Sequence, residues 1–154
     1  MVLIPRITAL KEQGDAGSDM ALCVLGAVYI NDNVIERDST KALEYLEKAA
    51  ERNNPRAFNY LGRIYLDGLG VEQDYDKAME YFRKAVENGE SHGDALNFIG
   101  LMYENGDGVE TDYQKAFEYY EKAAKLGHKT AKKNIQKLVD NGHISREEAA
   151  EWVD

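Results

Sequence analysis

A repeated block of about 36 residues constrains the fold of this chain more than any other feature. A motif of the form Ala-x-x-x-Leu/Ile-Gly-x-x-Tyr and a motif of the form Lys-Ala-x-Glu-Tyr-x-x-Lys-Ala each occur three times. Successive copies of both motifs are spaced by 36 and then 38 residues, at 21–29, 57–65 and 95–103 and at 41–49, 77–85 and 115–123. Agreement at fixed offsets over three units indicates a tandem structural repeat.

Each unit is predicted to be a helix, a loop and a second helix. In the first motif of the second unit, the apolar residues Ala57, Leu61, Ile64 and Tyr65 lie one or two helical turns apart. This spacing is typical of one face of an amphipathic helix and not of a strand. The second motif carries a similar stripe, so the sequence predicts three helix pairs.

Small residues mark where the two helices of a pair approach each other. A glycine inside a helix costs up to about 1 kcal/mol relative to alanine, and one recurs in every first helix. We therefore predict a close contact at Gly26, Gly62 and Gly100, with Ala42, Ala78 and Ala116 as the counterparts on the second helices.

The helix ends are also predicted from short polar residues. An Asp side chain at an N-cap accepts a free backbone N–H, and we assign this role to Asp38, Asp74 and Asp112. A residue able to adopt a left-handed conformation is favoured just after a helix. We assign that position to Asn53, Gly89 and Gly127.

Both ends of the chain depart from the full repeat. After Lys129 the first-helix spacing continues for half a unit, but Gln136 replaces the register glycine. Residues 145–148 (Ser-Arg-Glu-Glu) form a capping box that predicts a last short helix ending in Trp152. At the other end, residues 7–13 are expected to form a short helix.

The loops between paired helices identify the kind of repeat. The loops at residues 67–74 and 105–112 share the pattern Gly-x-Gly-Val, and the Asp that ends each loop begins the sequence Asp-Tyr-x-Lys-Ala, at 74–78 and 112–116. Over residues 20–140 the chain closely resembles the Sel1-like repeat, a longer-looped relative of the tetratricopeptide repeat. The first unit departs from the pattern, because residues 31–38 lack the loop glycines.

The resemblance implies an all-α fold, a right-handed α-solenoid superhelix of antiparallel helix pairs whose first helices line the concave face. We expect one domain over residues 1–154. Its parts would be an N-terminal remnant at 5–17, repeats at 20–54, 55–92 and 93–129, and a C-terminal half repeat with a capping helix at 130–154.

The resemblance also implies a function. Proteins of this family typically act as adaptors or scaffolds, so we expect a non-catalytic module that binds a protein or peptide partner on the concave face. The variable first-helix positions would contact the partner. In the first unit these include Met20, Cys23 and Ala27; elsewhere we single out Arg56, Asn59, Arg63, Leu66, Asp94, Asn97, Leu101, Glu104 and Lys133.

The composition argues against several other classes of protein. The net charge of −9 disfavours binding to nucleic acid or to an anionic membrane, and no apolar run approaches the length of about 18 residues that spans a membrane. We expect no metal, cofactor or catalytic residue. The three histidines are interpreted as solvated loop residues, and the single Cys23 as a small packing residue. The first residues lack the pattern of a signal peptide, so we expect a cytoplasmic protein.

Three alternative functions stay open. The acidity would suit an inhibitor or immunity-type protein that neutralises a basic partner. Cysteine-rich members of the family have been linked to β-lactam binding, a role that a single cysteine disfavours. Weak self-association through the apolar first unit or the last helix is the third hypothesis.

Overall fold

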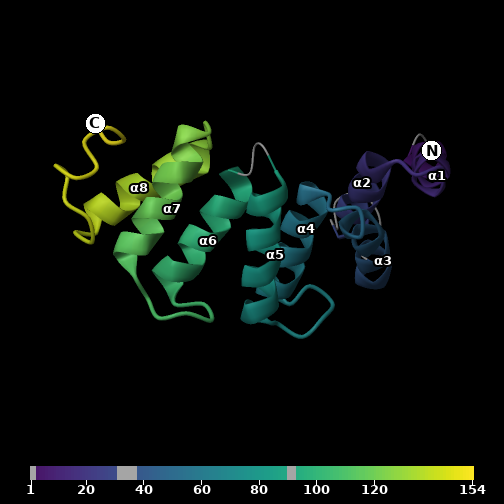
Figure 1. Ribbon diagram of the computed structural model, residues 1–154, viewed down its shortest axis with the longest axis horizontal. Helices are drawn as coiled ribbons and strands as arrows, with labels where there is room; N and C mark the ends of the chain where they lie inside the picture. The colour runs from purple at the N-terminus through teal and green to yellow at the C-terminus, as the bar shows by residue number, and fades with distance from the viewer. Residues whose placement is uncertain (1–2, 31–37, 90–92) are drawn as a thin grey trace. The chain divides into compact units, whose positions relative to one another are not determined.

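The computed structural model of the protein describes residues 3–30, 38–89 and 93–154, and within these residues it contains eight helices and no strand (Figure 1). In chain order the helices are α1 (Leu3–Asp15), α2 (Asp19–Ile30), α3 (Ser39–Ala50), α4 (Pro55–Asp67), α5 (Tyr75–Asn88), α6 (Gly93–Asn105), α7 (Tyr113–Lys125) and α8 (Lys129–Asp140). The predicted all-α fold of helix pairs is confirmed.

The chain divides into two compact units, Met1–Asn88 and Gly89–Asp154, and each is described by itself. In the first unit α2 packs on α3 and α4 on α5, while α1 lies against α2 and α3 against α4. In the second unit α7 packs against both α6 and α8. The single domain over residues 1–154 stays a prediction.

All three predicted Asp caps are present. The residues three positions later donate their backbone N–H groups to the carboxylates of Asp38, Asp74 and Asp112, at 3.0, 3.0 and 2.9 Å. Each Asp also donates its own backbone N–H to a carbonyl near the end of the preceding helix, at Tyr29, Tyr65 and Tyr103. The same residue therefore starts one helix and ties it to its partner, which explains why it recurs in every unit.

Two of the predicted left-handed residues are confirmed, since Asn53 and Gly127 have φ of 57° and 82°. The glycine-free loop of the first repeat, residues 31–37, lies outside the described residues.

The register glycines lie in close contact with the second helix of their pair, as predicted. A Cβ atom added to Gly62 would lie 2.6 Å from Cε1 of Phe82. The other two glycines have the same relation to the second helix of their pair, with Leu46 Cγ at 2.4 Å from Gly26 and Tyr120 Cε1 at 2.6 Å from Gly100. The predicted counterparts Ala42 and Ala78 were wrong by one turn, because the nearest atoms to a Cβ at Gly26 or Gly62 belong to the large side chain four residues further along. The third counterpart, Ala116, does lie close to Gly100, since its carbonyl oxygen would be 3.2 Å from the added Cβ, but Tyr120 is closer still.

The recurring tyrosines form a stacked pair between the two helices of each repeat. The ring centroids of Tyr29 and Tyr45 are 5.8 Å apart. The equivalent pairs, Tyr65 with Tyr81 and Tyr103 with Tyr119, are 5.8 and 5.7 Å apart. Lysines of the second helix lie over these rings, as Lys77 does over Tyr65 at 4.9 Å. Stacking and cation–π contacts of this kind stabilise a partly exposed surface, so these tyrosines have a structural role.

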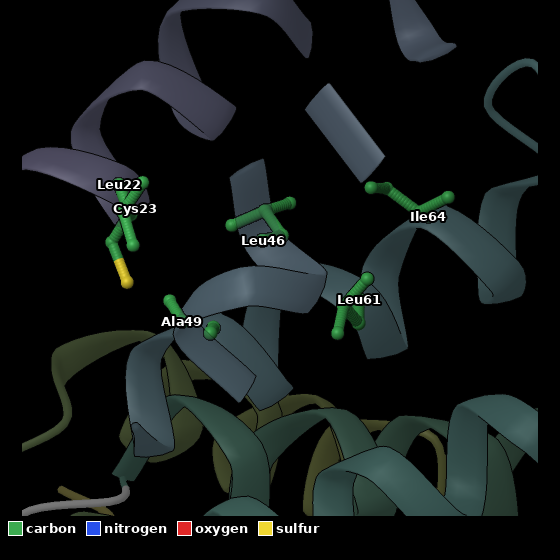
Figure 2. Packing of buried hydrophobic residues seen from close by; sticks show 7 residues of the cluster. Leu22, Cys23, Leu46, Ala49, Leu61 and Ile64 are labelled. Atoms are coloured by element: carbon green, nitrogen blue, oxygen red, sulfur yellow. The ribbon is translucent and has the colours of Figure 1, made fainter. Parts of the chain in front are cut away.

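One buried cluster in the compact unit Met1–Asn88 joins three helices (Figure 2). It consists of buried side chains from α2, α3 and α4, namely Leu22, Cys23, Leu46, Ala49, Ala57, Leu61 and Ile64. Each of these side chains is at most 3% exposed. This cluster holds α2 beside α4.

The C-terminal capping helix was predicted wrongly, because the residues after α8 form a series of turns. Half of the capping box is present, since the backbone N–H of Glu148 donates to Ser145 Oγ at 3.1 Å. The predicted helix was short, and short helices are marginal unless packing supports them. The turns are held by burial of Ile144 and Ala149 and by a hydrogen bond from Trp152 Nε1 to Glu121.

Candidate functional site

Helix α2 is apolar around its whole circumference, with Asp19 as its one charged residue. One side, at Leu25 and Tyr29, packs against α1, and another forms the core of the first unit. The remaining side is uncovered, with Met20 64% and Val24 38% exposed. A helix that is hydrophobic all round is normally buried. The exposed apolar side of α2 is therefore unusual for a folded chain.

An open groove of about 230 Å³ lies along this side of α2. It is lined by Met20, Cys23, Val24, Ala27 and Val28 of α2 and by Arg56 and Tyr60 of α4, and we call it the α2–α4 groove. Four of these residues, Met20, Cys23, Ala27 and Arg56, are among the variable first-helix positions expected from the sequence. Val24, Val28 and Tyr60 were missed, and the sequence signal that could have found them is the absence of polar residues around α2.

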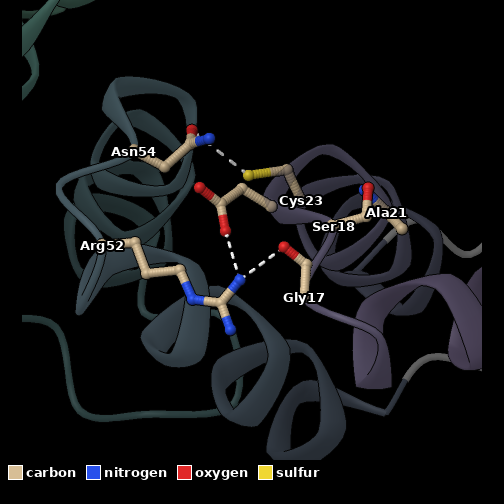
Figure 3. Close-up of polar contacts among 7 residues, drawn as sticks. Gly17, Ser18, Ala21, Cys23, Arg52 and Asn54 are labelled. Carbon is tan, nitrogen blue, oxygen red and sulfur yellow. Dashed lines mark hydrogen bonds and ion pairs between the residues drawn. The ribbon is translucent and has the colours of Figure 1, made fainter.

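One of the residues that line the groove, Cys23, hydrogen-bonds Asn54, the N-cap residue of α4 (Figure 3). Its Sγ donates to Oδ1 of Asn54 at 3.4 Å, and the same oxygen accepts the backbone N–H groups of Arg56 and Ala57 at 3.0 and 3.3 Å. Burial raises the pKa of the Cys23 thiol to about 11. The side chain of Cys23 is only 3% exposed and belongs to a buried apolar cluster, which confirms the expected packing role.

Two arginines, Arg52 in the turn after α3 and Arg56 at the start of α4, differ in their charge environment. Arg52 Nη1 contacts Asp19 Oδ1 at 2.8 Å and the carbonyl of Gly17 at 2.6 Å (Figure 3). Arg56 is exposed on the groove, and no ion pair to it is present in residues 3–30, 38–89 and 93–154. The groove therefore combines an apolar wall with one uncompensated positive charge.

The other predicted contact residues of α4 lie outside the lining of this groove. Arg63 is exposed and Leu66 is half-buried. Asn59 is half-buried, and its Oδ1 is a buried acceptor without a hydrogen-bond partner among the described residues. A buried carbonyl oxygen in this state is unfavourable.

In the second unit Asp94 is engaged by the residue that caps α8. His128 Nδ1 accepts the backbone N–H of Ala131 at 3.1 Å, and Nε2 lies 2.7 Å from Asp94 Oδ1. Since Nδ1 accepts, a neutral His128 carries its proton on Nε2 and donates it to Asp94. The interpretation of His128 as a solvated residue was wrong, because its side chain is only 19% exposed.

Two further predicted contact residues of the second unit make hydrogen bonds within the chain. Asn97 is buried, and its Oδ1 accepts from Nδ2 of Asn134 at 3.0 Å. Glu104 accepts a hydrogen bond from the hydroxyl of Tyr120. Burial raises the pKa of Tyr120 well above its usual range, so the phenol is the donor. The remaining two positions differ in exposure, with Leu101 half-buried and Lys133 exposed.

Within the described residues, no three His, Cys, Asp or Glu side chains gather closely enough to hold a metal ion. None of the helices described there has the length and apolar character needed to cross a membrane.

Comparison with known proteins places these features in one family. The Sel1 repeat profile matches residues 19–54, 55–90 and 93–128. No protein with a curated description matches the chain.

Among solved structures, a Sel1 repeat protein from Oxalobacter formigenes is similar over 95% of this chain and 60% of its own length, with 30% identity and a TM-score of 0.80. The protective antigen c5321 of uropathogenic Escherichia coli, described as displaying an SLR fold, has 29% identity and a TM-score of 0.76. That similarity covers 88% of this chain and 29% of the antigen.

Cysteine rich protein B of Helicobacter pylori is similar over 81% of this chain and 93% of its own, with 27% identity and a TM-score of 0.61. The chain thus spans about three fifths of the Oxalobacter protein and less than a third of the Escherichia coli antigen. With three matched repeats over more than half of its residues, the chain belongs to the Sel1 repeat family.

Proposed function

We propose that this protein is a non-catalytic interaction module that binds a protein or peptide partner through the face formed by its first helices. Sel1 repeat proteins are generally protein-interaction modules. The α2–α4 groove is where we place the principal contact.

The observation that carries this proposal is the uncovered apolar side of α2. Met20 and Val24 are large hydrophobic residues that stay 64% and 38% exposed beside a groove of about 230 Å³. Exposed apolar patches on folded proteins mark interaction sites. Met, Tyr and Arg are also the residue types enriched at protein interfaces, and Met20, Tyr60 and Arg56 all line this groove.

A peptide display selection tests the proposal directly, because a random library samples many different candidate segments. A random dodecapeptide library on phage is selected on the full chain, and enriched peptides are measured by fluorescence anisotropy. The same peptides are then tested on Val24→Glu, which places a charge in the groove, and on Leu126→Glu. Leu126 is the matched control, because it is also a large exposed hydrophobic residue, at 45%, but lies in the second unit.

We expect enriched peptides to lose binding by about 10-fold or more on Val24→Glu and to bind Leu126→Glu as they bind the natural sequence. Circular dichroism checks that both variants fold. If no peptide is enriched, or if every enriched peptide binds both variants equally, the groove is not an interaction site.

The remaining predicted contact residues of α4 extend the test. The double variant Asn59→Ala and Arg63→Ala would weaken the binding of a partner that extends beyond the groove along α4. A partner confined to the groove would bind this double variant unchanged, which would remove these two residues from the proposed interface.

A further inference from the structure

The α2–α4 groove differs from the rest of the repeat in a way that indicates the chemistry of its occupant. In the repeat register, Met20 takes the position of Arg56, Asp94 and Thr130 in the later units. Ala27 likewise takes the position of Arg63, Leu101 and Lys137. Each later first helix has a charged or polar residue at one or both of these positions, whereas α2 is apolar at both. An apolar group of the occupant therefore fits the side of the groove that α2 forms.

The size of the groove limits what the apolar part of that occupant can be. Sites for small molecules and cofactors typically measure about 300–1,000 Å³ and enclose most of the ligand. The α2–α4 groove measures about 230 Å³ and is open to solvent. It therefore suits one or two side chains of a polypeptide better than a whole small molecule. The flexible thioether of Met20 can adjust to the shape of such a side chain.

Charge sets the second requirement. Asp19 lies at the start of α2, but Arg52 already contacts it at 2.8 Å and also donates to the carbonyl of Gly17. No residue in the described part of the chain pairs with Arg56. A guanidinium presents a fork of N–H donors that matches a carboxylate. The natural counterpart of the exposed Arg56 is thus an Asp, a Glu or a C-terminal carboxylate next to the apolar side chain.

We propose that the occupant of the α2–α4 groove is a polypeptide segment that seats an apolar side chain against Met20 and Val24 and places a neighbouring carboxylate on Arg56. This inference rests on the proposed function and names the partner's chemistry. The acid would select among apolar segments, because electrostatic complementarity contributes more to specificity than to raw affinity.

The peptides enriched on the full chain provide the test. Each enriched peptide is synthesised with its acidic residue as Asp or Glu and again with Asn or Gln at that position. Both forms are measured on the natural sequence and on Arg56→Gln. Arg52→Gln serves as the matched control for loss of an arginine, since Arg52 is already paired with Asp19.

We expect every enriched peptide to carry an acid within a few residues of an apolar residue. Replacing that acid with its amide should weaken binding to the natural sequence about 3- to 5-fold, the upper part of the range for a solvent-exposed ion pair, and should change binding to Arg56→Gln less than about 1.5-fold. Arg52→Gln should keep the preference for the acid.

Each other result overturns a distinct statement. Enriched peptides that need Val24 but show no preference for an acid would refute this inference and leave the proposed function standing. Peptides that ignore Val24→Glu would refute both. Light scattering that shows a dimer of the free chain, dissolved by Val24→Glu, would identify a second copy as the occupant and also refute the inference.

Discussion

Replacing Gly62 with alanine tests whether helix-pair contact explains the register glycines. The added Cβ would lie 2.6, 2.8 and 2.9 Å from three ring atoms of Phe82, namely Cε1, Cδ1 and Cζ. These distances are shorter than real Cβ contacts, so the ring or the helices must shift. Phe82 is completely buried, at 0% exposure, and a close-packed interior leaves such a ring little space to move.

Two opposing effects determine the size of the change. Alanine gains about 1 kcal/mol over glycine in a helix interior, whereas overpacking a core costs about 1–3 kcal/mol. Because three atoms of a buried ring are too close to the new Cβ, we expect the upper part of that range. The net loss for Gly62→Ala is then about 1–2 kcal/mol, or roughly 4–16 °C in the melting temperature of a unit of this size.

Urea unfolding followed by circular dichroism measures this loss. The same change is then made in a Phe82→Val background, where the three ring atoms are absent. There the helix propensity acts alone, so Gly62→Ala should become stabilising by about 1 kcal/mol. If Gly62→Ala already stabilises the natural sequence, the close approach of α4 and α5 does not explain the glycine.

Three further predictions follow from single contacts. Tyr120→Phe removes the hydrogen bond to Glu104 and should destabilise the second unit by about 1.5–3 kcal/mol in urea unfolding, whereas Tyr119→Phe should change it by less than half as much. The thiol of Cys23, 3% exposed and with a pKa raised to about 11 by burial, should react with a disulfide reagent at pH 8 at least about 10-fold more slowly in the folded than in the urea-unfolded chain; equal rates would contradict its burial. The pKa of Asp38 is lowered, chiefly by the backbone N–H of Lys41, so its contribution is present above the ordinary value near 3.8 and is lost as the pH falls through the folded pKa. Asp38→Asn should therefore flatten the acid limb of the thermal stability curve, and an unchanged limb would refute the cap assignment.

The helix pairs could be predicted because their determinants are local and recur. An Asp at the start of a helix and a glycine at a fixed offset produce the same contact wherever they occur, as Asp74 and Gly62 show. The residue facing each glycine could not be predicted, because both Ala78 and Phe82 lie on the inner side of α5 and are completely buried. Only the relative placement of the two helices decides which of them fills the space.

The candidate site was less predictable, because register identifies variable positions but not their neighbours. Asn97 and Glu104 are variable in sequence, yet Asn134 and Tyr120 hydrogen-bond them within the chain. Tyr120 stood outside the recurring tyrosines in the sequence, although it occupies the same register position as Phe82. A pattern search for identical residues misses such equivalence, since the position demands bulk and burial and not one side chain.

The position of the groove follows from what the repeat leaves free. Positions that form caps, close contacts and stacked tyrosines are fixed by packing in every unit, so only the solvent-facing positions of the first helices can vary without loss of the fold. At the positions of Met20 and Ala27, the later first helices carry charged residues at Arg56, Arg63, Asp94 and Lys137, which stay in water at little cost. Met20 and Val24 stay exposed on α2. A partner that covered them would gain about 25 cal/mol of binding free energy for each Å² of apolar area buried. Within the described residues, the α2–α4 groove is thus where we propose that a partner would bury apolar area that the folded chain itself leaves exposed.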